Sequence, residues 1–380
     1  MLQPQDPPAP ASHSAHAIAP ARVLRGPGAW TEALPLLPAL SRRPLLLGRS
    51  AATRPLRQAL AEDLRRQGCR PHAAELRHDC CEEDLAPLAE QARSEACDGV
   101  IAAGGGKVLD AGKLLAHRLG LACITVPTSA ATCAGWTALA NLYSPQGAFR
   151  SDVALERCPD LLVFDHDLVR PAPPRTLASG IADAVAKWYE ASVSSGSSQD
   201  GLVQQAVQMA RVLRDQLLLD GKAALENPGG PLWERVAEAS ALTAGLIGGI
   251  GGARCRTVAA HAVHNGLTQL SSCHGALHGE KVGFGILVQL RLEEMVGGSQ
   301  LAAQARRQLL PFLRSLGVPV CLEDLGLAGA SLEDLQAVCA FACRRDSDLH
   351  HLPFPVGSQE LLAALVSTTA PCHASERTPA

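Results

Sequence analysis

The chain has 380 residues, a length at which a prior of about 150 residues per domain predicts two or three domains. Lysine and arginine number 34 against 37 aspartate and glutamate residues, and this balance, a formal net charge of −3, argues against a nucleic-acid-binding protein. Hydrophobic residues make up 47% of the chain and charged residues 19%, which excludes a largely disordered protein.

The ends of the chain are predicted to be tails, over residues 1–20 and 371–380. Residues 1–20 are rich in proline, alanine and histidine and lack the basic and apolar segments of a signal peptide. No run of about 18 apolar residues occurs, so no membrane association is predicted. The 13 cysteines are irregularly spaced without a CxxC pair, which is typical of reduced thiols in a cytoplasmic protein.

Short apolar runs alternate with helical patterns in the first half of the chain. We expect strands at residues 44–48, 98–102, 121–126 and 161–165, helices at 53–67 and 108–119, and a hairpin of 138–143 with 148–153. Alternation of strands and helices predicts a parallel sheet with helices on both faces. This part, residues 21–170, is therefore expected to be an α/β dinucleotide-binding domain.

The pattern changes after the proline-rich segment at residues 171–174. The segment 175–193 has an apolar stripe of Leu177, Ile181, Val185 and Trp188, and few strand signals follow it. Residues 171–370 are therefore expected to form an all-helical domain. A glycine cluster at Gly245 to Gly252 predicts close helix packing or a bend, with a ligand role as the alternative.

A glycine-rich turn, Gly104-Gly105-Gly106-Lys107, lies between a predicted strand and a predicted helix. Such a turn lets the backbone approach a pyrophosphate at a helix N-terminus, although it matches neither the P-loop nor the GxGxxG pattern, and a turn without a ligand is the alternative. Arg49 follows the first predicted strand, where an arginine can accept the 2′-phosphate of NADP; a solvated loop arginine is the alternative.

Two histidines and an aspartate suggest an open metal site. Asp183 lies on an otherwise apolar helical face, and His261 and His278 lie in two later segments. These residue types could hold Zn²⁺ or Fe²⁺ with a position free for substrate. The alternative readings are a capping or ion-pairing aspartate and a hydrogen-bonded pair of His261 and His264.

Four stretches together resemble the glycerol dehydrogenase branch of the iron-containing alcohol dehydrogenase family. They are DGVIAAGGGKVLDAGK (98–113), VPTSAATCAGWTALANLY (126–143), LASGIADAVAKWYEA (177–191) and the segment 258–289. The resemblance implies a Rossmann-like α/β domain, an all-α metal-binding domain and a cleft between them. It also implies a homo-oligomer that transfers a hydride between NAD or NADP and the CH–OH or C=O group of a small alcohol, polyol or 2-hydroxy or 2-oxo acid.

The resemblance also assigns residues. It implies that Asp183, His261 and His278 are metal ligands, that His264 orients the site, and that coenzyme contacts are made by Gly104, Gly105, Gly106, Lys107, Thr128, Thr137, Leu139 and Tyr143. The iron-type relatives carry a fourth ligand, a histidine, where this chain has Lys187, so zinc is favoured over iron.

Besides Ala131, where glycerol dehydrogenases often have a serine, two departures from these enzymes concern substrate and coenzyme. Cys133 replaces an aspartate thought to meet the polyol, and Arg49 replaces an aspartate at the adenosine ribose, so NADP is slightly favoured over NAD. The segments AATCAGWT and AKWYEA are similar to a hydroxycarboxylate dehydrogenase subgroup that reduces 2-oxo acids with NADPH. There Lys187 would pair with a substrate carboxylate; pairing with Glu190 or with water is equally open.

Three other functions remain open at this point. They are an NAD-dependent glycerol dehydrogenase, a polyol-phosphate enzyme of the same superfold, and a non-catalytic nucleotide-binding protein.

Overall fold

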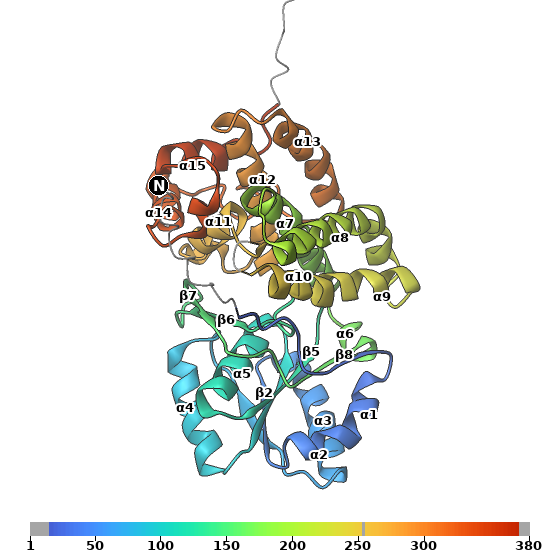
Figure 1. Ribbon diagram of the computed structural model, residues 1–380. Helices are drawn as coiled ribbons and strands as arrows, with labels where there is room; N and C mark the ends of the chain where they lie inside the picture. Colours follow the sequence, from blue (N-terminus) through green and yellow to red (C-terminus); the bar gives the residue numbers. More distant parts are fainter. Residues whose placement is uncertain (1–14, 253–254, 372–380) are drawn as a thin grey trace, which may run out of the picture.

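A parallel sheet of six strands forms the lower half of the molecule in Figure 1. The structure is a computed structural model that describes residues 15–252 and 255–371. The strand order is β1-β8-β5-β4-β2-β3, with β1 (Val23–Gly26), β2 (Pro44–Gly48), β3 (His72–Glu75), β4 (Gly99–Gly104), β5 (Ala122–Pro127) and β8 (Leu161–Asp165). All neighbouring strands pair in parallel, which confirms the predicted sheet.

The buried strands alternate their side chains between two apolar cores. Leu45 and Leu47 of β2 pack in one core, whereas Leu46 packs in the other, as the two-residue period of a strand requires. Helices cover both faces of the sheet: α1 (Ala29–Ala33), α2 (Leu37–Leu40), α3 (Arg54–Arg66), α4 (Glu82–Ser94), α5 (Gly106–Leu119) and α6 (His166–Val169). The predicted α/β architecture is therefore confirmed.

The predicted hairpin is present as a separate two-stranded antiparallel sheet. It consists of β6 (Leu139–Tyr143) and β7 (Phe149–Ala154), and it lies between the parallel sheet and the upper helices in Figure 1. The backbone N–H of Tyr143 donates a 2.8 Å hydrogen bond to the carbonyl oxygen of Cys80. This bond ties the hairpin to the loop that follows β3.

The second half of the described chain is helical. Its helices are α7 (Pro174–Ser195), α8 (Gly201–Glu226), α9 (Pro231–Glu238), α10 (Ala244–Gly251), α11 (Ala259–Leu267), α12 (His278–Met295), α13 (Gln300–Ser315), α14 (Leu332–Ala342) and α15 (Ser358–Val366). Helices α7 and α12 are buried over most of their length and pack against each other. Helix α8 packs against α7, and α11 and α13 pack against α12. The domain boundary near residue 170 stays a prediction.

Glycines allow the two halves to approach closely. A Cβ atom on Gly180 of α7 would lie 1.9 Å from the carbonyl oxygen of Ala130, in the loop after β5. On α10, a Cβ on Gly245 would lie 2.5 Å from Trp136, and one on Gly249 would lie 2.1 Å from the carbonyl oxygen of Ile18. Close packing therefore explains Gly245 and Gly249, whereas Gly252 has nothing within 4 Å of an added Cβ and adopts a positive φ of 69°.

The residues just before β1 are packed against the body of the molecule. The indole N–H of Trp136 donates to the carbonyl oxygen of Ile18 at 3.0 Å, and the thiol of Cys158 donates to that of Ala17 at 3.3 Å. The prediction of a tail over residues 1–20 is therefore wrong for Ala17 and Ile18, because both are held by long-range contacts. Residues 1–14 and 372–380 of the two predicted tails lie outside the described residues.

Two further expectations concern cysteines and membranes. Every cysteine in the described ranges is a free thiol, as the irregular spacing predicts. No helix within those ranges is long and apolar enough to cross a bilayer.

Candidate active site

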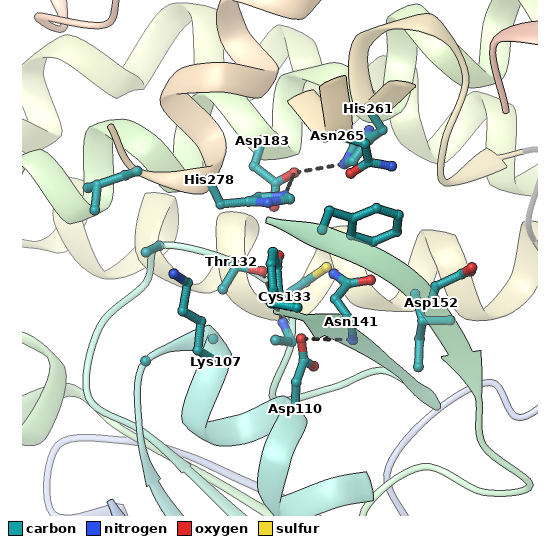
Figure 2. A pocket seen from close by; sticks show the side chains of 18 of the residues that line it. Lys107, Asp110, Thr132, Cys133, Asn141, Asp152, Asp183, His261, Asn265 and His278 are labelled. Atoms are coloured by element: carbon teal, nitrogen blue, oxygen red, sulfur yellow. Dashed lines mark hydrogen bonds and ion pairs between the residues drawn. The ribbon is translucent and has the colours of Figure 1, made fainter. Parts of the chain in front are cut away.

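A cavity of about 780 Å³ lies between the carboxyl ends of the sheet strands and the helical half. Arg49 follows β2, the triple glycine follows β4 and Thr128 follows β5, and all of them line the cavity. Asp183, His261 and His278 line its other side (Figure 2). The carboxyl ends of parallel strands are the usual place of a ligand in open α/β sheets.

The glycine-rich turn forms the strand-to-helix junction that the sequence predicts. Strand β4 ends at Gly104, and α5 begins at Gly106. A Cβ on Gly104 would lie 2.7 Å from Val108, and one on Gly106 would lie 2.7 Å from Thr132, so the close approach of the next segments requires glycine. Gly105, Gly106 and Lys107 line the cavity, so the N–H groups of the α5 N-terminus could bind a pyrophosphate there.

The other predicted coenzyme residues line the same region of the cavity. They are Thr128, Thr137, Leu139 and Tyr143. A buried lysine of α5, Lys113, donates to the carbonyl oxygens of Thr137 and Leu139 and lies 3.0 Å from the carboxylate of Asp110. Burial raises the pKa of Asp110 although Lys113 opposes this shift. Lys113 and Asp110 thus fix the loop before β6, and sequence reasoning missed both.

The three predicted metal ligands come together from three helices. In Figure 2, Asp183 of α7 lies between His261 of α11 and His278 at the start of α12. Oδ1 of Asp183 lies 3.4 Å from Nε2 of His261 and 3.5 Å from Nε2 of His278. This oxygen is buried and makes no hydrogen bond within the described residues. One carboxylate and two imidazole nitrogens within 4.8 Å of one another fit a divalent metal ion.

Hydrogen bonds hold His261 in the form that a metal needs. Glu190, one turn after Lys187 on α7, is fully buried, and its Oε2 accepts a 2.7 Å hydrogen bond from Nδ1 of His261. Its Oε1 accepts from the backbone N–H groups of Val258 and His261. Because a carboxylate only accepts, Nδ1 carries the proton and Nε2 is left to face Asp183.

A second chain of hydrogen bonds orients the imidazole of His278. The carbonyl oxygen of the Asn265 side chain accepts from Nδ1 of His264 at 2.9 Å, so Nε2 of His264 accepts from Nδ1 of His278 at 3.0 Å. Nε2 of His278 is then also left to face Asp183. His264 therefore lies where the predicted orienting role requires.

The charges around the cluster shift its pKa values. Burial would raise the pKa of Asp183, but His278, His261 and Lys187 together hold it well below its usual range. Burial opposes a charged His261, yet Glu190 and Asp183 raise its pKa to about 9. Burial and the nearby His278 and Lys281 hold the pKa of His264 well below its usual range. The cluster is thus a set of strongly interacting groups, as metal sites are.

Lys187 and Cys133 lie beside this cluster and line the cavity. Lys187 is only 4% exposed, and within the described chain its ammonium donates one hydrogen bond, to the carbonyl oxygen of Arg256 at 3.2 Å. Among the described residues Lys187 forms no ion pair with Glu190, one of the open alternatives; the oxygens of Glu190 accept from His261 and Val258 instead. Burial raises the pKa of Cys133, so its thiol is neutral.

A second cluster of possible ligands consists of His78, Cys81 and Asp84, in the loop after β3 and the first turn of α4. Oδ2 of Asp84 accepts from the backbone N–H groups of Arg77 and His78, and Oδ1 lies 3.5 Å from the Arg77 guanidinium. Asp84 therefore stabilises the loop, and an adjacent cation disfavours a metal there.

The fold and the site define a metal-dependent dehydrogenase of the Rossmann-like class. The family model for iron-containing alcohol dehydrogenases matches residues 20–166. An uncharacterised oxidoreductase of Synechocystis is 60% identical over 76% of this chain and 75% of its own length. A glycerol dehydrogenase of Thermotoga maritima is 34% identical over 76% of this chain and 78% of its own, and hydroxycarboxylate dehydrogenase A of Escherichia coli is 34% identical over 76% and 79%.

A solved structure shares the whole architecture. The crystal structure of a probable glycerol dehydrogenase from Sinorhizobium meliloti 1021 superposes with a TM-score of 0.83 at 28% identity and covers 93% of this chain and 97% of its own. The chain belongs to the iron-containing alcohol dehydrogenase family. It is an oxidoreductase that acts on the CH–OH groups of small molecules, and its family implies NAD(H) and a divalent metal ion as cofactors.

Proposed function

We propose that the protein is a hydroxycarboxylate dehydrogenase that reduces a 2-oxo acid with NADPH. Lys187 carries the proposal, because it is a buried ammonium in the cavity wall one helical turn from Asp183. Within the described residues its ammonium donates one hydrogen bond, to the carbonyl oxygen of Arg256, so it keeps donors for a substrate carboxylate. A 2-oxo acid places a carboxylate next to the carbonyl group that is reduced.

Cys133 supports an anionic substrate for a complementary reason. Glycerol dehydrogenases carry an aspartate at this position, which would repel a carboxylate and pair with Lys187. The neutral thiol of Cys133 leaves the charge of Lys187 available to the substrate. The exchange thus favours an acid over a polyol.

Asp183, His261 and His278 would hold the metal ion, with zinc favoured because Lys187 replaces the fourth histidine of iron-type relatives. When bound, such an ion polarises the substrate oxygen and stabilises negative charge on it. Glu190 and His264 keep the two imidazoles aligned, as their hydrogen bonds indicate. The α5 N-terminus with Lys107 would bind the coenzyme pyrophosphate, and Arg49 would bind the 2′-phosphate.

Lys187→Met tests the substrate assignment. We expect the wild-type protein, loaded with zinc, to reduce pyruvate with a higher kcat/KM than hydroxyacetone, its uncharged analogue of similar size. The variant should lose about a hundredfold or more of kcat/KM for the acid, because a buried charge pair contributes several kcal/mol. Its activity on hydroxyacetone should change far less.

Lys222→Met, at an exposed position of α8, is the matched control and should leave both substrates unaffected. Equal losses on the acid and the uncharged ketone would contradict the role of Lys187. A wild-type preference for glycerol and dihydroxyacetone would instead identify a glycerol dehydrogenase.

A further inference from the structure

One buried carboxylate joins the two cations that the proposed function assigns to coenzyme phosphates. Oδ1 of Asp79 lies 2.6 Å from a guanidinium nitrogen of Arg49, and Oδ2 accepts a hydrogen bond from the ammonium of Lys107. Asp79 follows β3, whereas Arg49 follows β2 and Lys107 belongs to α5. Three neighbouring strand ends thus bring these charges together.

The cations face the cavity, and the carboxylate lies behind them. Arg49 and Lys107 line the cavity with side chains that are 40% and 45% exposed, whereas the side chain of Asp79 is 6% exposed. A coenzyme phosphate could therefore reach both cations without removing Asp79. The phosphate would nevertheless bind nitrogen atoms that are already paired with the Asp79 carboxylate.

The position of Asp79 is fixed by its neighbours in the chain. The N–H of His78 donates to Asp84 at 2.7 Å, and the carbonyl oxygen of Cys80 accepts from the N–H of Tyr143. With both flanking residues held by hydrogen bonds, the backbone keeps Asp79 beside Arg49 and Lys107.

Coenzyme selection in dinucleotide folds depends on the sign of the charge near the adenosine ribose. An acidic side chain favours the ribose 2′-OH of NAD, and an arginine accommodates the 2′-phosphate of NADP. In this chain both determinants are present and are joined in one ion pair.

We propose that Asp79 opposes Arg49 in coenzyme selection: its carboxylate competes with the 2′-phosphate for the Arg49 guanidinium, so the Arg49–Asp79 pair sets the preference between NADP and NAD. This inference rests on the proposed binding of the adenosine ribose at Arg49. It adds a negative selector from a different loop, the one after the next strand, β3.

The size of the effect follows from the charges. A negative charge a few ångströms from a phosphate repels it, and the repulsion is stronger in a protein than in water. Loss of the Asp79 charge should therefore tighten binding of the 2′-phosphate about tenfold.

Titration calorimetry with 2′,5′-ADP and 5′-AMP on the full-length, zinc-loaded protein tests the inference. We expect Asp79→Asn to lower the Kd for 2′,5′-ADP about tenfold and to change the Kd for 5′-AMP much less. Glu83→Gln, which removes an exposed carboxylate from the nearby first turn of α4, should leave both values unchanged. Should Asp79→Asn fail to fold, as circular dichroism would show, Asp79→Ser is predicted to give the same selective tightening.

An unchanged or weaker affinity for 2′,5′-ADP after removal of the Asp79 charge would overturn the inference. Arg49→Ala separates this failure from failure of the proposed function. If Arg49→Ala weakens 2′,5′-ADP binding and Asp79→Asn does not tighten it, only the opposing role of Asp79 is wrong. If Arg49→Ala leaves 2′,5′-ADP binding unchanged, the assignment of the 2′-phosphate to Arg49 is wrong, and the role of Asp79 falls with it.

Discussion

Glu190 and His261 share a 2.7 Å hydrogen bond, and both side chains are buried in the helical half. Glu190 lies seven residues after Asp183 on α7, so one face of this helix carries both a candidate metal ligand and the residue that orients a second one. The same carboxylate also accepts from two N–H groups at the start of α11. Glu190 therefore fixes both the ring of His261 and the start of α11 relative to α7.

Glu190→Gln is expected to weaken zinc binding by about 10- to 100-fold, the usual effect of losing a side chain that orients a metal ligand. The amide cannot accept from all three donors at once, so one N–H group would face an NH₂ group. Competition with a chelator measures the affinity. Glu333→Gln, at an exposed site in the first turn of α14, is the control. Wild-type zinc affinity in Glu190→Gln would show that this hydrogen bond does not matter to the site.

The absence of a side chain at Gly180 allows α7 to pack directly against the loop that contains predicted coenzyme contacts. Because a Cβ would lie 1.9 Å from the backbone oxygen of Ala130, Gly180→Ala must displace that loop or the helix. We expect a loss of about 1–3 kcal/mol in the free energy of unfolding and a raised KM for coenzyme. Denaturant unfolding and steady-state kinetics measure the two effects. Gly201→Ala, with nothing within 4 Å of the added methyl group, should show neither.

The central strands could be predicted because they are buried on both faces. Leu45 to Leu47 and Val100 to Ala102 are continuous apolar runs, whereas β1 and β3 are short, partly exposed edge strands that no apolar run marks. The glycine turn and the Asp183, His261 and His278 set were accessible through residue type and resemblance.

The supporting residues could not be predicted in the same way. Asp79 contacts Arg49 after β2 and Lys107 of α5, and Lys113 contacts the segment at the start of β6. Only the tertiary structure brings these residues together. The position of Glu190 could have been predicted, because its spacing from Asp183 places both residues on one helical face. No local pattern indicated that it would bind His261. Such residues are recognised by burial combined with charge.

Glu293 on α12 makes the stability of the folded protein depend on pH. Burial raises its pKa from 4.5 to about 7, although a hydrogen bond from Gln289 opposes the shift. Between about pH 4.5 and pH 7 the carboxyl group of Glu293 is protonated in the folded protein but ionised in the unfolded chain. The free energy of unfolding therefore falls as the pH rises through this range. Glu293→Gln should match the wild type near pH 4.5 and be more stable by about 1–3 kcal/mol near pH 8. Thermal unfolding at both pH values tests this; an equal difference at the two values would contradict the raised pKa.

The zinc content of the reconstituted protein, measured together with its rate of NADPH oxidation, tests whether Asp183, His261 and His278 hold a metal ion. We expect one zinc ion per wild-type chain, and loss of both zinc and activity in His261→Ala and in His278→Ala. The orphaned oxygen of Asp183 predicts the same loss for Asp183→Asn. Full zinc occupancy and full activity in any one of these three variants would contradict the assignment of the metal site.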